Sequence, residues 1–163
     1  MKTTPKLSIL WIALASIAPT IAVAEEPFYE GLGSTRRPVS SSSEKAKAYV
    51  NQGLAFVYGF NHGAAIRSFQ QAADLDPECA MAHWGVALAS GPHINFPIVP
   101  PPAAELAWKE LQLAQKYAPK AAPVERALIK ALSKRYANPQ PEDRAPLDRA
   151  YASAMRNVWK RFP

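Results

Sequence analysis

Three histidines and a single cysteine are the residues of this 163-residue chain that are best suited to bind a metal ion. His62 and His93 fall in two predicted turns, which the packing of neighbouring helices could bring together. Cys79 and His83 are four residues apart and share one face of a predicted helix, and thiolate and imidazole are ligands for zinc or copper. Neither pair supplies the three or four ligands of a stable site. The alternative is that Cys79 is a small buried residue and that each histidine forms a capping or surface hydrogen bond.

Other catalytic signatures are missing from the sequence. It contains no phosphate-binding loop, no Gly-x-Ser-x-Gly elbow, no Cys-x-x-Cys pair and no haem attachment motif. Glu105, Glu110 and Glu125 are predicted to lie on exposed helix faces, where nothing would activate a carboxylate for acid–base chemistry. We therefore predict that the protein is not an enzyme and needs no cofactor.

The segment at residues 49–77, YVNQGLAFVYGFNHGAAIRSFQQAADLDP, predicts two short amphipathic helices that pack against each other. Apolar residues recur at steps of three and four in both helices. Small residues stand where the two backbones come close, phenylalanines fill the space beside them, and a proline ends the pair. The residues that define this pattern are Gly53, Phe56, Ala65, Phe69, Ala72 and Pro77.

This pattern resembles the tetratricopeptide repeat, a helical hairpin that recurs with a period of about 34 residues. The chain departs from the family consensus at Gln52, where leucine is usual, and at Tyr49, where tryptophan is common. The run YGFNHGAAIRSFQQAADLDPECAMAHWGVALASGP also resembles the opening of a group of exported bacterial tetratricopeptide proteins. The alternative is an ordinary helical hairpin whose small residues are coincidental.

The resemblance extends to a second unit, whose first helix is expected at residues 79–90. A proline-rich loop at 91–102, GPHINFPIVPPP, is inserted before its second helix. The positions that match the family in this unit are Ala87, Ala107, Ala114 and Pro119.

A third unit is expected to begin near Ala122, with helices at 124–136 and 146–162. The resemblance therefore implies an all-α solenoid over residues 43–163, with about three repeats at 46–79, 80–121 and 122–163. Because no atypical terminal unit follows Phe162, we expect either that the chain is the N-terminal part of a longer array or that a partner covers the end of the array.

Members of this family bind ligands in a concave groove that is lined by the first helix of each repeat. Carried over to this chain, its positions form an apolar trough that runs into a basic patch, which would suit a peptide with hydrophobic anchors and an acidic end. These positions are Val50, Leu54, Tyr58, Met81, Trp84, Leu88, Arg126, Lys130 and Lys134. The alternative is that the apolar residues pack beneath other parts of the chain and that the cations form a solvated face.

Positive charge is concentrated in the last third of the chain. Residues 120–163 contain 10 basic and 4 acidic residues, whereas residues 25–119 contain 7 basic and 9 acidic ones. Nucleic-acid binding would use this basic third, but no aromatic platform accompanies it, so we do not expect a nucleic-acid partner. Family members that hold chaperone tail carboxylates carry lysine and asparagine where this chain has Val50 and Leu54, so that activity is not expected either.

The N-terminus predicts a secretory signal peptide at residues 1–24, with cleavage after Ala24. Its apolar run of about 15 residues is too short for a spanning helix, so no stable membrane span is expected after cleavage. Residues 25–42 predict a flexible arm or linker rich in proline, glycine and serine. With a single cysteine no internal disulfide can form.

We therefore expect an exported protein of the periplasm or cell envelope that binds a protein or peptide partner through the groove and could also self-associate. The alternative function is a periplasmic metal-handling protein that uses the histidines and Cys79.

Overall fold

The computed structural model describes residues 25–34 and 36–163, so the predicted signal peptide at 1–24 lies outside the described residues. Over these ranges the chain is all-α, as predicted, with six α-helices, one short 3-10 helix and no β-strand. None of the described helices is long and apolar enough to cross a membrane. The elements are α1 (Glu44–Tyr58), α2 (His62–Leu75), α3 (Ala80–Ala89), α4 (Pro101–Tyr117), η1 (Ala118–Lys120), α5 (Pro123–Leu132) and α6 (Ala145–Arg161).

Side-chain caps and prolines set the starts of the helices. The Ser43 hydroxyl accepts a hydrogen bond from the Ala46 amide at the start of α1, and the Asn61 side chain accepts one from the Ala64 amide at the start of α2. Helices α4 and α5 have proline in their first turn, where a missing N–H group costs no hydrogen bond.

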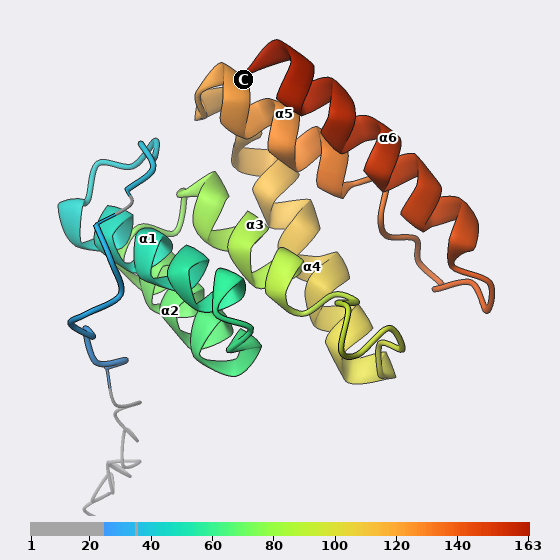
Figure 1. Cartoon of the computed structure of the whole chain (residues 1–163). Coiled ribbons are helices and arrows are strands. Elements are labelled where there is room, and N and C mark those ends of the chain that lie inside the picture. Colours follow the sequence, from blue (N-terminus) through green and yellow to red (C-terminus); the bar gives the residue numbers. More distant parts are fainter. Residues whose placement is uncertain (1–24, 35) are drawn as a thin grey trace, which may run out of the picture.

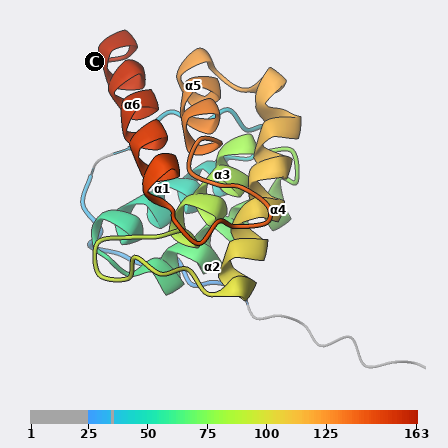
Figure 2. The same ribbon diagram turned by 90° about the vertical axis from the view of Figure 1, so that its right-hand side faces the viewer.

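The helices pack in three consecutive pairs, α1 with α2, α3 with α4 and α5 with α6, and each pair lies beside the next (Figure 1). Helix α3 is central, because it contacts α1, α2, α4 and α5. Every residue of α3 except Leu88 is buried. Helix α6 is at the edge of the molecule and packs mainly on α5 (Figure 2). None of its residues is fully buried.

The small residues predicted at helix crossings lie in the core, as their spacing required. Phe69 is fully buried and its ring contacts Gly53 of the first helix. Phe56 is half-buried at the edge of the same core, and α2 ends two residues before Pro77. The buried alanines predicted at close helix approaches are Ala65, Ala72, Ala87, Ala107 and Ala114. Pro119 lies in η1, directly after the end of α4.

Helix α5 is shorter than predicted, since it ends at Leu132 and not at residue 136. The next residues form tight turns, in which the Arg135 amide donates to the Leu132 carbonyl. Leaving the helix lets Tyr136 turn inward, where its hydroxyl donates to the Ala87 carbonyl at 2.6 Å. The contact of Tyr136 with α3 therefore outweighs the helical propensity of residues 133–136.

Residues 25–34 and 36–42, which were predicted to form a flexible arm or linker, contain no helix or strand and are docked along the helices (Figure 1). The Glu26 amide donates to the Gln71 side chain, and the Tyr29 amide donates to the Gln52 side chain. Further along, the Ser40 amide donates to the Glu125 carboxylate at 2.9 Å. These bonds satisfy backbone groups that a flexible linker would leave to water.

Candidate functional site

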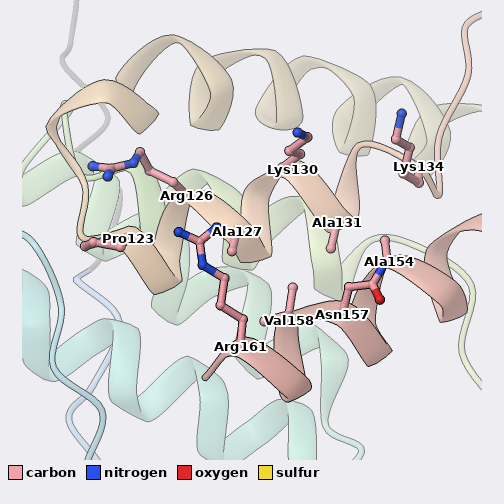
Figure 3. Close-up of a pocket in the computed structure, with 10 residues that line it drawn as sticks. All are labelled: Pro123, Arg126, Ala127, Lys130, Ala131, Lys134, Ala154, Asn157, Val158 and Arg161. Carbon is pink, nitrogen blue, oxygen red and sulfur yellow. The ribbon is translucent and has the colours of Figure 1, made fainter. Parts of the chain in front are cut away.

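A cleft of about 430 Å³ lies between α5 and α6 (Figure 3). One wall carries the three predicted groove cations: Arg126 and Lys130 are four residues apart on one face of α5, and Lys134 lies in the turn that follows the helix. The α6 wall adds Arg161, which extends toward α5 (Figure 3). Small and apolar side chains separate the charged ones: Pro123, Ala127, Ala131, Ala154 and Val158.

The cleft is strongly positive, because four of its ten lining residues are cationic and none is acidic. The ammonium groups of Lys130 and Lys134 have no hydrogen-bond or ion-pair partner among the described residues. The Arg126 guanidinium donates to the Ala121 carbonyl at 2.6 Å, which leaves most of its five N–H groups free. Such a surface attracts carboxylates or phosphates.

Three of the predicted apolar groove residues are not available to a ligand. Val50, Met81 and Trp84 are exposed by 0%, 1% and 6%. Met81 and Trp84 are buried because four helices surround α3, and Val50 packs in the same core cluster as Val39 of the docked arm. The predicted continuous apolar trough is therefore wrong at these positions.

The other predicted apolar residues keep part of their surface. Leu54 and Leu88 are half-buried, and Tyr58 is 78% exposed. Leu54 and Tyr58 line a separate pocket of about 340 Å³ together with Leu32 and Arg37 of the arm. The structure therefore divides the predicted groove into a basic cleft and a small pocket beside the arm.

The predicted histidine pair is brought together by the fold. His62, the first residue of α2, and His93, in the loop after α3, stack with ring centroids 3.9 Å apart and ring planes 12° from parallel. His62 Nδ1 donates to the Phe60 carbonyl at 3.2 Å. Burial lowers the pKa of His93 first, and the charges of His62 and Arg135 lower it further.

The predicted pair of Cys79 and His83 cannot act as free metal ligands. Both ring nitrogens of His83 are engaged, Nδ1 with the Glu110 carboxylate at 2.7 Å and Nε2 with the Pro77 carbonyl at 3.0 Å. Cys79 is fully buried, and burial raises the pKa of its thiol. No group of three or more histidine, cysteine, aspartate or glutamate side chains in the described part of the chain is placed to hold a metal ion.

Two of the acidic residues predicted to be exposed have structural partners. Glu125 is 1% exposed and accepts hydrogen bonds from the amides of Ser40 and Ala122. Glu110 is largely buried against His83, and Glu105 alone is exposed as predicted. Both buried carboxylates are therefore bound by internal donors and are not directed into the basic cleft.

The α6 contribution to the cleft was not among the predicted site residues. Ala154, Val158 and Arg161 recur at steps of four and three, which is the pattern of one helix face. That pattern was visible in the sequence, but only the packing of α6 on α5 shows that the face is turned toward the α5 cations.

Comparisons of this chain with models of protein families, with curated proteins and with solved structures find no match.

Proposed function

We propose that this chain is an exported scaffold of tetratricopeptide type that binds an acidic, helical segment of a partner protein in the cleft between α5 and α6. The observation that carries the proposal is that Arg126, Lys130, Lys134 and Arg161 line one cleft that has no acidic residue. No acidic side chain lines the cleft to neutralise these four cations, so the carboxylates of a partner protein would be attracted to it and would form ion pairs there.

The spacing of the cations favours a helical ligand. Arg126 and Lys130 are one turn apart in α5, so their Cα atoms lie about 6 Å apart along the helix axis, and Lys134 follows in the turn after α5. A second helix that carries Glu at every fourth position repeats its carboxylates with the same rise. The alanines and Val158 between the cations leave room for apolar anchors of that helix.

The pairing of consecutive helices supports the proposal that the scaffold is of tetratricopeptide type. Three consecutive helix pairs lie side by side, and the residues expected at close helix approaches are small and buried. The signal-like N-terminus supports export to the periplasm or cell envelope.

A designed peptide tests the binding site directly. The probe is a fluorescein-labelled amphipathic helix with Glu at i and i+4 on one face and Leu between, titrated into the chain by fluorescence anisotropy. We expect Lys130→Glu to weaken binding at least tenfold, because it reverses one of the four charges of the cleft. Binding should also weaken as salt is raised from 50 to 300 mM.

The matched control is Lys109→Glu, which makes the same charge change on an exposed residue of α4 outside the cleft. If Lys109→Glu and Lys130→Glu weaken binding equally, the effect is one of net charge and the cleft is not the site. Tighter binding of a single-stranded oligonucleotide of equal charge would also overturn the proposal. A variant Leu54→Glu that abolishes peptide binding would place the ligand in the pocket beside the arm.

A further inference from the structure

Four large apolar side chains project from the end of the molecule where the turn between α1 and α2 lies beside the loop after α3 (Figure 1). Ile94 and Ile98 are 84% and 76% exposed, and Phe60 and Phe96 are exposed over more than half of their surface. The described chain has eight exposed large apolar residues, so half of them are in this group. We call these four residues the apolar tip.

Aromatic contacts join the two segments into one surface. The rings of His62 and His93 stack with centroids 3.9 Å apart, the Phe60 ring lies 6.5 Å from His62, and the Phe96 ring lies 6.1 Å from His93. Within the loop, His93 and Phe96 exchange backbone hydrogen bonds of 2.9 and 3.1 Å. Ile94 is therefore held in a closed turn, and its exposure follows from the geometry of the fold.

The segments that carry the apolar tip contain no ionisable side chain other than histidine. Residues 48–66 and 79–104 include no lysine, arginine, aspartate or glutamate. Charged residues border the tip on its α4 side, where Ile98 lines a cleft together with Glu105 and Arg144. An ionised side chain is costly to place in lipid, so a surface without one can enter the edge of a bilayer.

The backbone of the loop also has few hydrogen-bond donors that depend on water. Five of the twelve residues at 91–102 are prolines, which have no N–H group. The amides of Gly91, His93 and Phe96 donate to carbonyls of the chain itself. Lipid offers no acceptor for a free N–H group, whereas a protein partner does, so this backbone is suited to lipid in particular.

We propose that the apolar tip inserts into the interfacial region of a lipid bilayer and holds the chain on the membrane surface without spanning it. Ile94 and Ile98 are more than three-quarters exposed, so they project from the protein and offer no hollow for a partner's side chain. A bilayer interface accepts projecting apolar and aromatic groups of this kind. Glu105 and Arg144 would then lie at the level of the lipid headgroups.

The test uses the chain that begins at Glu25, because it contains every described residue and lacks the apolar run at 7–21, which would bind lipid by itself. The chain is sedimented with vesicles of pure phosphatidylcholine. We expect binding that persists at 500 mM salt, since it depends on apolar contact and not on charge. The double variant Ile94→Ser/Ile98→Ser should weaken binding about tenfold.

The matched control is Trp159→Ser, which removes a 70% exposed apolar residue of α6 outside the tip and should leave vesicle binding unchanged. Lys130→Glu should also leave it unchanged, so this proposal and the acidic-peptide proposal can fail separately. Far-UV circular dichroism checks that each variant is folded.

A fluorescent label tests insertion directly. Cys79 is fully buried, so in the variant Ile94→Cys a nitrobenzoxadiazole label attaches at position 94. Its emission should rise and shift to the blue when vesicles are added, whereas the same label in Trp159→Cys should not change. The proposal is overturned by a silent label at position 94, by no binding to phosphatidylcholine, or by equal losses in the serine variants. Binding that requires anionic lipid and disappears at high salt would also overturn it, because the basic cleft would then be the contact.

Discussion

Phe69 of α2 lies directly over Gly85 of α3, where a Cβ atom added to the glycine would be 2.2 Å from Cδ1 of the ring. Gly53 of α1 approaches the same ring, and a Cβ atom there would be 2.7 Å from it. One buried phenylalanine is thus enclosed between two glycines of the neighbouring helices. This contact sets how closely α2 packs on both α1 and α3.

We predict that Gly85→Ala lowers the free energy of unfolding by about 3 kcal/mol, because the fully buried ring has no space into which it can move. Urea denaturation measures the change. The matched control is Gly63→Ala in α2, where the added methyl group meets only the end of a flexible arginine at 3.8 Å. Alanine should stabilise that helical position by about 0.5 kcal/mol. Equal effects at the two sites would contradict the close-packing argument.

The sequence predicted part of this packing, because close helix approaches need small residues at fixed steps: Gly53 was among the predicted positions, and Gly85 was not. The pairing of α1 with α2 followed from periodicity and from Pro77, which stands two residues after the end of α2. What it could not predict is which residues become buried by distant segments. Val50 and Trp84 have the helical spacing of a groove, and only the arm and the surrounding helices remove them from the surface.

The hydrogen bonds of His83 make stability depend on pH. Burial lowers the pKa of His83, but the hydrogen bonds to the Glu110 carboxylate and the Pro77 carbonyl outweigh it, so the folded-state pKa is raised above about 6.5. Stability from a raised pKa is fully present below the unfolded value of about 6.5 and is lost as pH rises through the folded-state pKa. We therefore expect the wild-type chain to lose stability above pH 6.5.

The variant His83→Gln separates this contribution from other titrations. This substitution should lower the free energy of unfolding by about 2 kcal/mol at pH 6. The loss should be smaller at pH 9, because the charged hydrogen bonds of His83 are weakened at that pH in the wild type as well. Thermal or urea unfolding of both chains across this range gives the difference. If the loss of stability caused by His83→Gln instead grew with pH, the pKa of His83 would not be raised in the folded state.

Glu125 ties the arm to the start of α5, and its removal should release the arm. Its two oxygens accept from the amides of Ser40 and Ala122 at 2.9 and 2.8 Å. We predict that Glu125→Ala lowers the free energy of unfolding by about 2 kcal/mol and exposes the Ser40 amide to hydrogen exchange. Glu105→Ala, on an exposed face of α4, should change stability by less than about 0.5 kcal/mol. Unchanged protection of Ser40 in Glu125→Ala would refute the role of this contact.

Glu105 and Glu125 differ in burial in a way that could not be predicted from the sequence. Both glutamates stand near the start of a helix that begins with proline, Glu125 in the first turn of α5 and Glu105 as the fifth residue of α4, and both were predicted to be exposed. One partner of Glu125, the Ala122 amide, is three residues away, but the other, the Ser40 amide, is 85 residues away, and no local pattern in the sequence indicates it. The candidate cleft shows the same limit, because Arg126, Lys130 and Lys134 were predicted from the groove positions of the resembled family, whereas the α6 wall comes from packing that was not predicted.

Gly91 and Tyr136 are in close contact near the end of α3. A Cβ atom added to Gly91 would lie 1.9 Å from the Tyr136 hydroxyl oxygen, and that hydroxyl donates to the Ala87 carbonyl near the end of α3. Gly91→Ala should therefore destabilise the chain by about 2 kcal/mol, because it displaces the hydroxyl. Tyr136→Phe should cost about 1 kcal/mol, since the carbonyl loses its donor.

The two changes should not add, because both act on one hydroxyl group. In the Tyr136→Phe background the clash is relieved, and we expect Gly91→Ala to cost about 1 kcal/mol less than in the wild type. A double-mutant cycle by urea denaturation measures this coupling energy. Strict additivity would mean that Gly91 is required for its backbone conformation and not for the space that Tyr136 occupies.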